Sequence, residues 1–129
     1  MAEALFAARA RESGATLSVA SAGTGALVGH PSPPEAVQLM AKRGLDISNH
    51  RGQQVTEPLV RRHDLILVME REHQRYLEGH WPMLKGRVRL LNEAEGTVAD
   101  PYKRSRKTYE ASLAQIDQGV TAWAEMILS

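Results

Sequence analysis

The sequence has 129 residues, with 16 lysines and arginines against 15 aspartates and glutamates, so its formal net charge is +1. Hydrophobic residues make up 43% and charged residues 24%, a composition typical of a globular domain and not of a disordered tail. The near-neutral charge provides no strong field to attract nucleic acid or an anionic membrane. The absence of cysteine excludes disulfides, thiolate metal sites and a cysteine nucleophile from these residues.

The length predicts one domain over residues 1–129. The longest apolar runs, such as Leu65–Met69, are far too short to span a bilayer, and the first residues do not form a secretory leader. We therefore expect a cytoplasmic protein without membrane insertion and without a nucleic-acid partner.

The first half of the chain predicts two helices and one strand. Met1–Ser13 is an alanine-rich helix, and no residue before it caps its free amides. Thr16–Ser21 alternates apolar and polar residues as a short strand does. Pro34 suits the first turn of a second helix, for which Gly44 is the expected stop.

The second half alternates strands and helices. Thr56 is placed to cap a short helix through His63. Asp64–Met69 is continuously apolar after its first residue, as in a strand buried on both faces, and Arg87–Leu91 is a third, shorter strand. Glu70–Glu78 lies between these strands and predicts a helix.

A long C-terminal helix is indicated by one apolar stripe whose members step by three or four residues: Tyr109, Leu113, Ile116, Val120, Trp123 and Ile127. Strands alternating with helices predict an α/β fold with a small parallel sheet and helices on both faces. Three strands are few for such a fold, and no strand leads into the first helix, so the architecture looks incomplete.

Several polar residues are candidates for chemistry. Asp100 lies in the dipeptide Asp100-Pro101 before the last helix, where it could act as a general acid or simply begin a turn. Ser21–Gly25 follows a strand and permits either a close approach to a ligand or an ordinary turn. His50-Arg51 could bind an anion or lie on the solvated surface.

Two other classes of site have little support. The histidines show no helical metal-binding pair, so we expect no metal and no cofactor. A basic cluster at the start of the last helix indicates charge pairing or anion binding nearby, but too few aromatic residues accompany it for nucleic-acid binding: Lys103, Arg104, Arg106 and Lys107.

Taken together, the sequence resembles the low-molecular-weight protein tyrosine phosphatases, and most closely the bacterial subgroup associated with exopolysaccharide synthesis. The matching stretches occur in the family's order over nearly the whole chain: MAEALF, SAGTGALVGHPSPPEAV, LDISNHRGQQV, HDLILVMEREH and ADPYKRSRKTYE. Arsenate reductases share this fold, but they use several cysteines and do not need an Asp-Pro acid.

The resemblance implies a mechanism in which a thiolate attacks phosphorus and a cysteinyl-phosphate is then hydrolysed by water. It assigns Asp100 as the acid that protonates the phenolic leaving group. Leu27 and Tyr102 match positions that line the cleft for the phosphotyrosine ring, and Ser21 and His50 match residues that hold the phosphate-binding loop. The implied partner is a phosphotyrosine protein such as a bacterial tyrosine kinase.

The sequence departs from the family at its first residue. In the family, the stretch matching MAEALF follows the first strand and the loop Cys-x5-Arg-Ser-Pro, neither of which is in this sequence. The resemblance implies four parallel strands in the order 2-1-3-4, so we expect an N-terminally truncated domain that lacks its central strand. We expect such a chain to be inactive and to self-associate through open strand edges. A non-catalytic protein that binds a partner or a phosphorylated ligand is the alternative.

Overall fold

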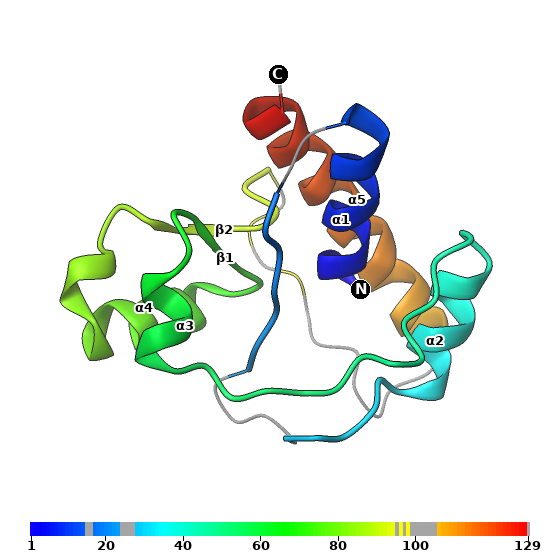
Figure 1. Ribbon diagram of the computed structural model, residues 1–129, viewed down its shortest axis with the longest axis horizontal. Helices are drawn as coiled ribbons and strands as arrows, with labels where there is room; N and C mark the ends of the chain where they lie inside the picture. Colours follow the sequence, from blue (N-terminus) through cyan, green and yellow to red (C-terminus); the bar gives the residue numbers. More distant parts are fainter. Residues whose placement is uncertain (15–16, 24–27, 95, 97, 99–105, 129) are drawn as a thin grey trace.

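The computed structural model describes residues 1–14, 17–23, 28–94, 96, 98 and 106–128 (Figure 1). Helices and strands alternate through the second half of the chain, as predicted. The elements are α1 (Ala2–Ser13), α2 (Pro34–Ala41), α3 (Glu57–Arg61), β1 (Ile66–Val68), α4 (Arg71–His80), the 3₁₀ turn η1 (Pro82–Leu84), β2 (Val88–Leu90) and α5 (Arg106–Leu128).

The sheet in the described residues consists of β1 and β2, which pair in parallel. Leu67 lies opposite Arg89 at the centre of the register. The two strands are the central parts of the predicted strands Asp64–Met69 and Arg87–Leu91, and α4 connects them as a crossover. The predicted α/β class with a small parallel sheet is therefore confirmed.

The predicted strand Thr16–Ser21 is wrong for residues 17–21, which form no strand; Thr16 lies outside the described residues. A strand needs a neighbour that offers backbone groups in register. Among described residues 17–23, only Gly23 has one, through a single parallel bridge to Gln54. The segment stays extended without becoming part of a ladder, so the described sheet has two strands and not the family's four.

The ends of the helices follow the local sequence. α2 begins at Pro34 as predicted, and Gly44 (φ +76°) ends it. The Gly44 N–H donates to the Ala41 carbonyl and the Leu45 N–H to the Met40 carbonyl, the paired bonds of a Schellman motif. Thr56 caps α3 by accepting a bond from the Leu59 N–H. No side chain caps the start of α1.

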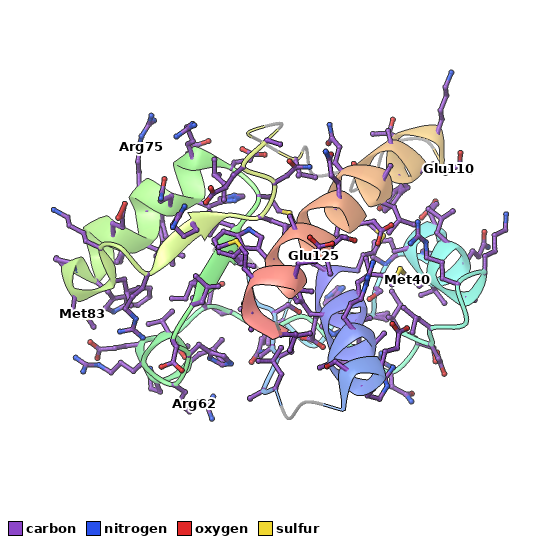
Figure 2. The ribbon with its side chains drawn as sticks, turned by 90° about the horizontal axis from the view of Figure 1, so that it is seen from above. Met40, Arg62, Arg75, Met83, Glu110 and Glu125 are labelled. Atoms are coloured by element: carbon purple, nitrogen blue, oxygen red, sulfur yellow. The ribbon has the colours of Figure 1, made fainter. Side chains whose placement is uncertain are left out.

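The main core lies between α5, α1 and α2. Most of the predicted stripe of α5 is buried there, together with Leu5, Phe6 and Met40. Ile127 is the exception, since 40% of it is exposed and the stripe ends before it. α1 packs along α5 (Figure 2), and the Arg9 guanidinium donates to the Thr121 hydroxyl at 2.7 Å.

A second core lies on the other face of the sheet, beneath α3, α4 and η1. Val68 belongs to this second core, whereas Leu65, Leu67 and Met69 pack against the main one. β1 is therefore covered on both faces, which explains its continuously apolar sequence. The buried members of the second core are Val60, Val68, Leu77, Leu84, Val88 and Leu90.

Among the described residues, no helix combines the length and the hydropathy that crossing a membrane requires.

Candidate active site

A cavity of about 330 Å³ lies at the first turns of α1. Four parts of the chain line it: the α1 region, the end of the extended segment 17–22, Ser32 just before α2, and the loop after α2. Its polar lining includes Glu3, Ser21, Asp46 and His50. The cavity therefore lies where an extended segment ends and a helix begins, which is where α/β folds place their ligands.

Glu3 joins the two predicted loop-supporting residues. The Ser21 hydroxyl donates to Glu3 Oε1 at 2.8 Å, and His50 Nδ1 lies 3.8 Å from Glu3 Oε2. About a third of the side-chain surface of Glu3 and of His50 is exposed, so water reaches this cluster. A carboxylate in the first turn of a helix also interacts favourably with the helix dipole.

The loop after α2 holds His50 in place through its own backbone. The Ser48 N–H donates to Asp46 Oδ1 at 2.8 Å, and the His50 N–H donates to the Ile47 carbonyl. Hydrogen bonds from the Ser48 hydroxyl and N–H lower the pKa of Asp46. The Arg51 guanidinium donates to the carbonyls of Ser48 and His50 at 2.9 and 2.8 Å. Arg51 therefore braces this loop.

Ser21 is positioned by residues 53–55, which follow the same loop. Its carbonyl accepts a bond from Gln53 Nε2 at 2.8 Å. Two residues later, the Gly23 N–H donates to the Gln53 carbonyl and the Gly23 carbonyl accepts from the Val55 N–H. These bonds hold the segment that carries Ser21 against residues 53–55, which follow the loop that carries His50.

The arrangement of Ser21, Glu3 and His50 is suited to holding neighbouring chain in place, and it does not provide a nucleophile. In a Ser-His-carboxylate triad the histidine lies between the serine and the carboxylate. Here Glu3 lies between Ser21 and His50, so the histidine is not placed to take the proton of the serine hydroxyl. Within the part of the chain that the structure describes, no three His, Asp or Glu side chains form a metal-binding group.

The structure brings together only part of the predicted site. Ser21 and His50 meet through Glu3, whereas Asp100, Leu27 and Tyr102 lie outside the described residues. Sequence reasoning missed Glu3. The signal that could have identified it is an acidic residue in the first turn of a helix that lacks a capping side chain.

Comparison with known proteins identifies the family. The family model described as low molecular weight phosphotyrosine protein phosphatase matches residues 1–128. A probable low molecular weight protein-tyrosine-phosphatase, EpsP of Ralstonia nicotianae, is 44% identical over 98% of this chain and 86% of its own length. Wzb of Salmonella typhimurium, a phosphatase of the same description, is 36% identical over 87% of this chain and 76% of its own.

A solved structure agrees in fold. The tyrosine phosphatase Wzb of Escherichia coli K30, in complex with sulphate, superposes with a TM-score of 0.90 at 30% identity. The match covers 98% of this chain and 87% of that one. With the sequence match over almost every residue and the same fold, the chain belongs to the low molecular weight phosphotyrosine protein phosphatase family.

Proposed function

We propose that residues 1–129 form one domain of a phosphatase that hydrolyses phosphotyrosine through a cysteinyl-phosphate. The family match over residues 1–128 is the observation that carries this proposal. The link from Ser21 through Glu3 to His50 supports it, because it brings together two residues assigned to the support of one loop.

In the proposed reaction, a cysteine thiolate forms a bond to phosphorus as the bond from phosphorus to the phenolic oxygen breaks. Asp100 gives its proton to the departing phenolate. The Asp100 carboxylate then takes a proton from water, whose oxygen attacks phosphorus and releases inorganic phosphate and the thiolate. Leu27 and Tyr102 hold the aromatic ring, and Ser21 and His50 support the loop that binds the phosphate.

The nucleophile has to come from outside these residues, because none of the 129 is cysteine. The chain as it stands is therefore proposed to be inactive. General acid catalysis contributes about 10²–10⁴-fold and does not replace the nucleophile. The proposed partner is a tyrosine-phosphorylated protein such as a bacterial tyrosine kinase, and the proposed location is the cytoplasm; both rest on the family resemblance.

Two proteins test the proposal with p-nitrophenyl phosphate and a phosphotyrosine peptide. The 129-residue chain should show no turnover. A chimera with a strand and a Cys-x5-Arg-Ser-Pro loop joined before Met1 should turn over both substrates. Turnover by the 129-residue chain that disappears in Asp100→Ala would contradict the cysteinyl-phosphate route.

The chimera also tests the role of Asp100 as the general acid. Asp100→Asn should slow formation of the phosphoenzyme by about 10²–10⁴-fold with phosphotyrosine, and less with p-nitrophenyl phosphate, whose leaving group needs less help from a proton. Asp64→Asn is the matched control, since Asp64 is an exposed aspartate at the start of the β1 region. An unchanged rate with phosphotyrosine in Asp100→Asn removes Asp100 from the mechanism.

A further inference from the structure

The outer edge of β2 is the edge that faces away from β1. The Arg87 carbonyl and the Leu91 N–H both form hydrogen bonds to β1. Successive residues of a strand direct their backbone groups to opposite edges, so in this register Val88 and Leu90 direct theirs outward. The outer edge of β2 therefore carries the carbonyl and N–H groups of Val88 and Leu90.

Side chains of two helices occupy both carbonyls of this outer edge. Gln74 Nε2 in α4 donates to the Val88 carbonyl at 2.7 Å, and the Trp123 indole N–H in α5 donates to the Leu90 carbonyl at 3.1 Å. Within the described residues, no hydrogen bond engages the Leu90 N–H. A pairing strand needs acceptors as well as donors, so the outer edge is blocked against a strand but keeps a donor.

A cavity of about 220 Å³ lies at the outer edge of β2. Its lining consists of Arg71, Gln74, Arg89, Leu90 and Glu93. Arg71 begins α4 shortly after β1 ends, and Glu93 lies shortly after the end of β2. The cavity is therefore at the carboxyl ends of parallel strands, which is where α/β folds bind their ligands.

Two guanidinium groups give the lining of this cavity an excess of positive charge. Arg89 is held in place, because its Nη2 lies 2.7 Å from Glu93 Oε1 and its Cζ lies 5.4 Å from the centre of the Trp123 ring. Arg71 is exposed and makes no hydrogen bond or ion pair within the described residues. One carboxylate against two guanidinium groups leaves the lining with a net charge of +1.

We propose that this cavity binds an oxyanion, the carboxylate or phosphate group of a ligand, through Arg71, Arg89 and the Leu90 N–H. All three are donors, and an ionised oxyanion accepts hydrogen bonds from a guanidinium in pairs. The proposed reaction would supply two such ligands: acidic side chains of a protein substrate, and the inorganic phosphate that is released. The choice between these sources rests on the proposed function, whereas the binding of an oxyanion does not.

The experiment titrates the 129-residue chain with sodium phosphate and, separately, with the peptide acetyl-Gly-Glu-Glu-Gly-amide, at a constant ionic strength set with sodium chloride. NMR follows the backbone N–H of Leu90 and the side-chain N–H groups of Arg71 and Arg89. We expect saturable shifts of all three signals. Tighter binding of the peptide identifies acidic side chains as the source, and tighter binding of phosphate identifies free phosphate. Shifts that do not saturate, or that chloride alone reproduces, overturn the proposal.

Three variants test the assignment of the residues. Arg71→Gln should weaken binding of the tighter probe by about threefold or more, because one guanidinium is lost. Arg75→Gln is the matched control and should leave binding unchanged, since Arg75 is exposed one turn further along α4 and outside the lining (Figure 2). Glu93→Gln should strengthen binding, because the carboxylate that competes for Arg89 is removed.

Equal weakening in the two arginine variants, or weaker binding in Glu93→Gln, contradicts the proposed oxyanion site. Neither titration measures turnover. The oxyanion site can therefore fail while the chimera hydrolyses both of its substrates, and it can hold while the chimera is inactive.

Discussion

At the scale of single residues, Glu3 connects positions that are far apart in the sequence. It accepts a hydrogen bond from Ser21, 18 residues away, and lies 3.8 Å from His50. The roles of Ser21 and His50 were inferred from the resemblance, whereas their meeting point depends on how α1 packs against two other segments. Periodicity does not report such a contact, because it describes one element at a time.

Ser21→Ala should lower the free energy of unfolding by about 1 kcal/mol, because the Glu3 carboxylate loses its hydroxyl donor in a half-buried site. Ser18→Ala is the control, since Ser18 is exposed in the same extended segment. Urea denaturation of both variants measures the difference. Equal, small losses in the two variants would mean that the bond to Glu3 adds no stability.

Asp46→Asn should show a pH-dependent loss of stability. Hydrogen bonds from Ser48 lower the pKa of Asp46 in the folded chain. A lowered folded pKa adds stability above the unfolded pKa, about 3.9 for aspartate, and that stability is lost as the pH falls through the folded pKa. The variant should therefore unfold in less urea than wild type at pH 7, and the difference should shrink below pH 4. A difference that stayed constant or grew as the pH fell would contradict the assignment.

At the scale of elements, the approach of α5 to the chain after β2 depends on one glycine. A Cβ added at Gly119 would lie 2.5 Å from the Leu91 carbonyl oxygen, a backbone atom that does not move aside easily. The Trp123 indole N–H donates to the Leu90 carbonyl at 3.1 Å, one turn further along the helix. The close contact therefore sets the depth at which α5 lies over the sheet.

Gly119→Ala should lower the free energy of unfolding by about 1–3 kcal/mol, even though alanine favours a helix by about 1 kcal/mol over glycine. Gly79→Ala in α4 is the matched control, since an added Cβ there meets nothing within 4 Å. That change should raise stability by about 0.5–1 kcal/mol. Thermal unfolding followed by circular dichroism shows whether each substitution raises or lowers the stability. A rise in stability for both variants would contradict the close contact at Gly119.

The elements also show how far the sequence predicts this fold. The stripe of α5, the proline start of α2 and its glycine stop are local patterns, and the structure confirms them. The prediction failed at residues 17–21, where the alternation is that of a strand but none of the described segments pairs with them in register. Strand propensity depends on the surrounding sheet more than helix propensity does on its neighbours, so alternation alone did not suffice.

At the scale of the whole molecule, one edge of β1 predicts association between copies. β2 pairs with the other edge, and no backbone hydrogen bond within the described residues engages Leu67 on this one. Strand edges with unpaired backbone groups tend to pair with each other. Sedimentation velocity of the 129-residue chain should therefore show weight-average mass rising with concentration. A concentration-independent monomer would rule out this association.

The contact between α1 and α5 joins the first and the last of the described elements. Ribosomes add about 5–20 residues per second, so α1 is made roughly 5–20 seconds before α5 is complete. Leu5 and Phe6 have no partner in α5 during that interval, although α5 supplies much of the core that later buries them. Synthesis therefore leaves the apolar side of α1 uncovered until α5 is made, and chaperones near the ribosome should bind the nascent chain at α1.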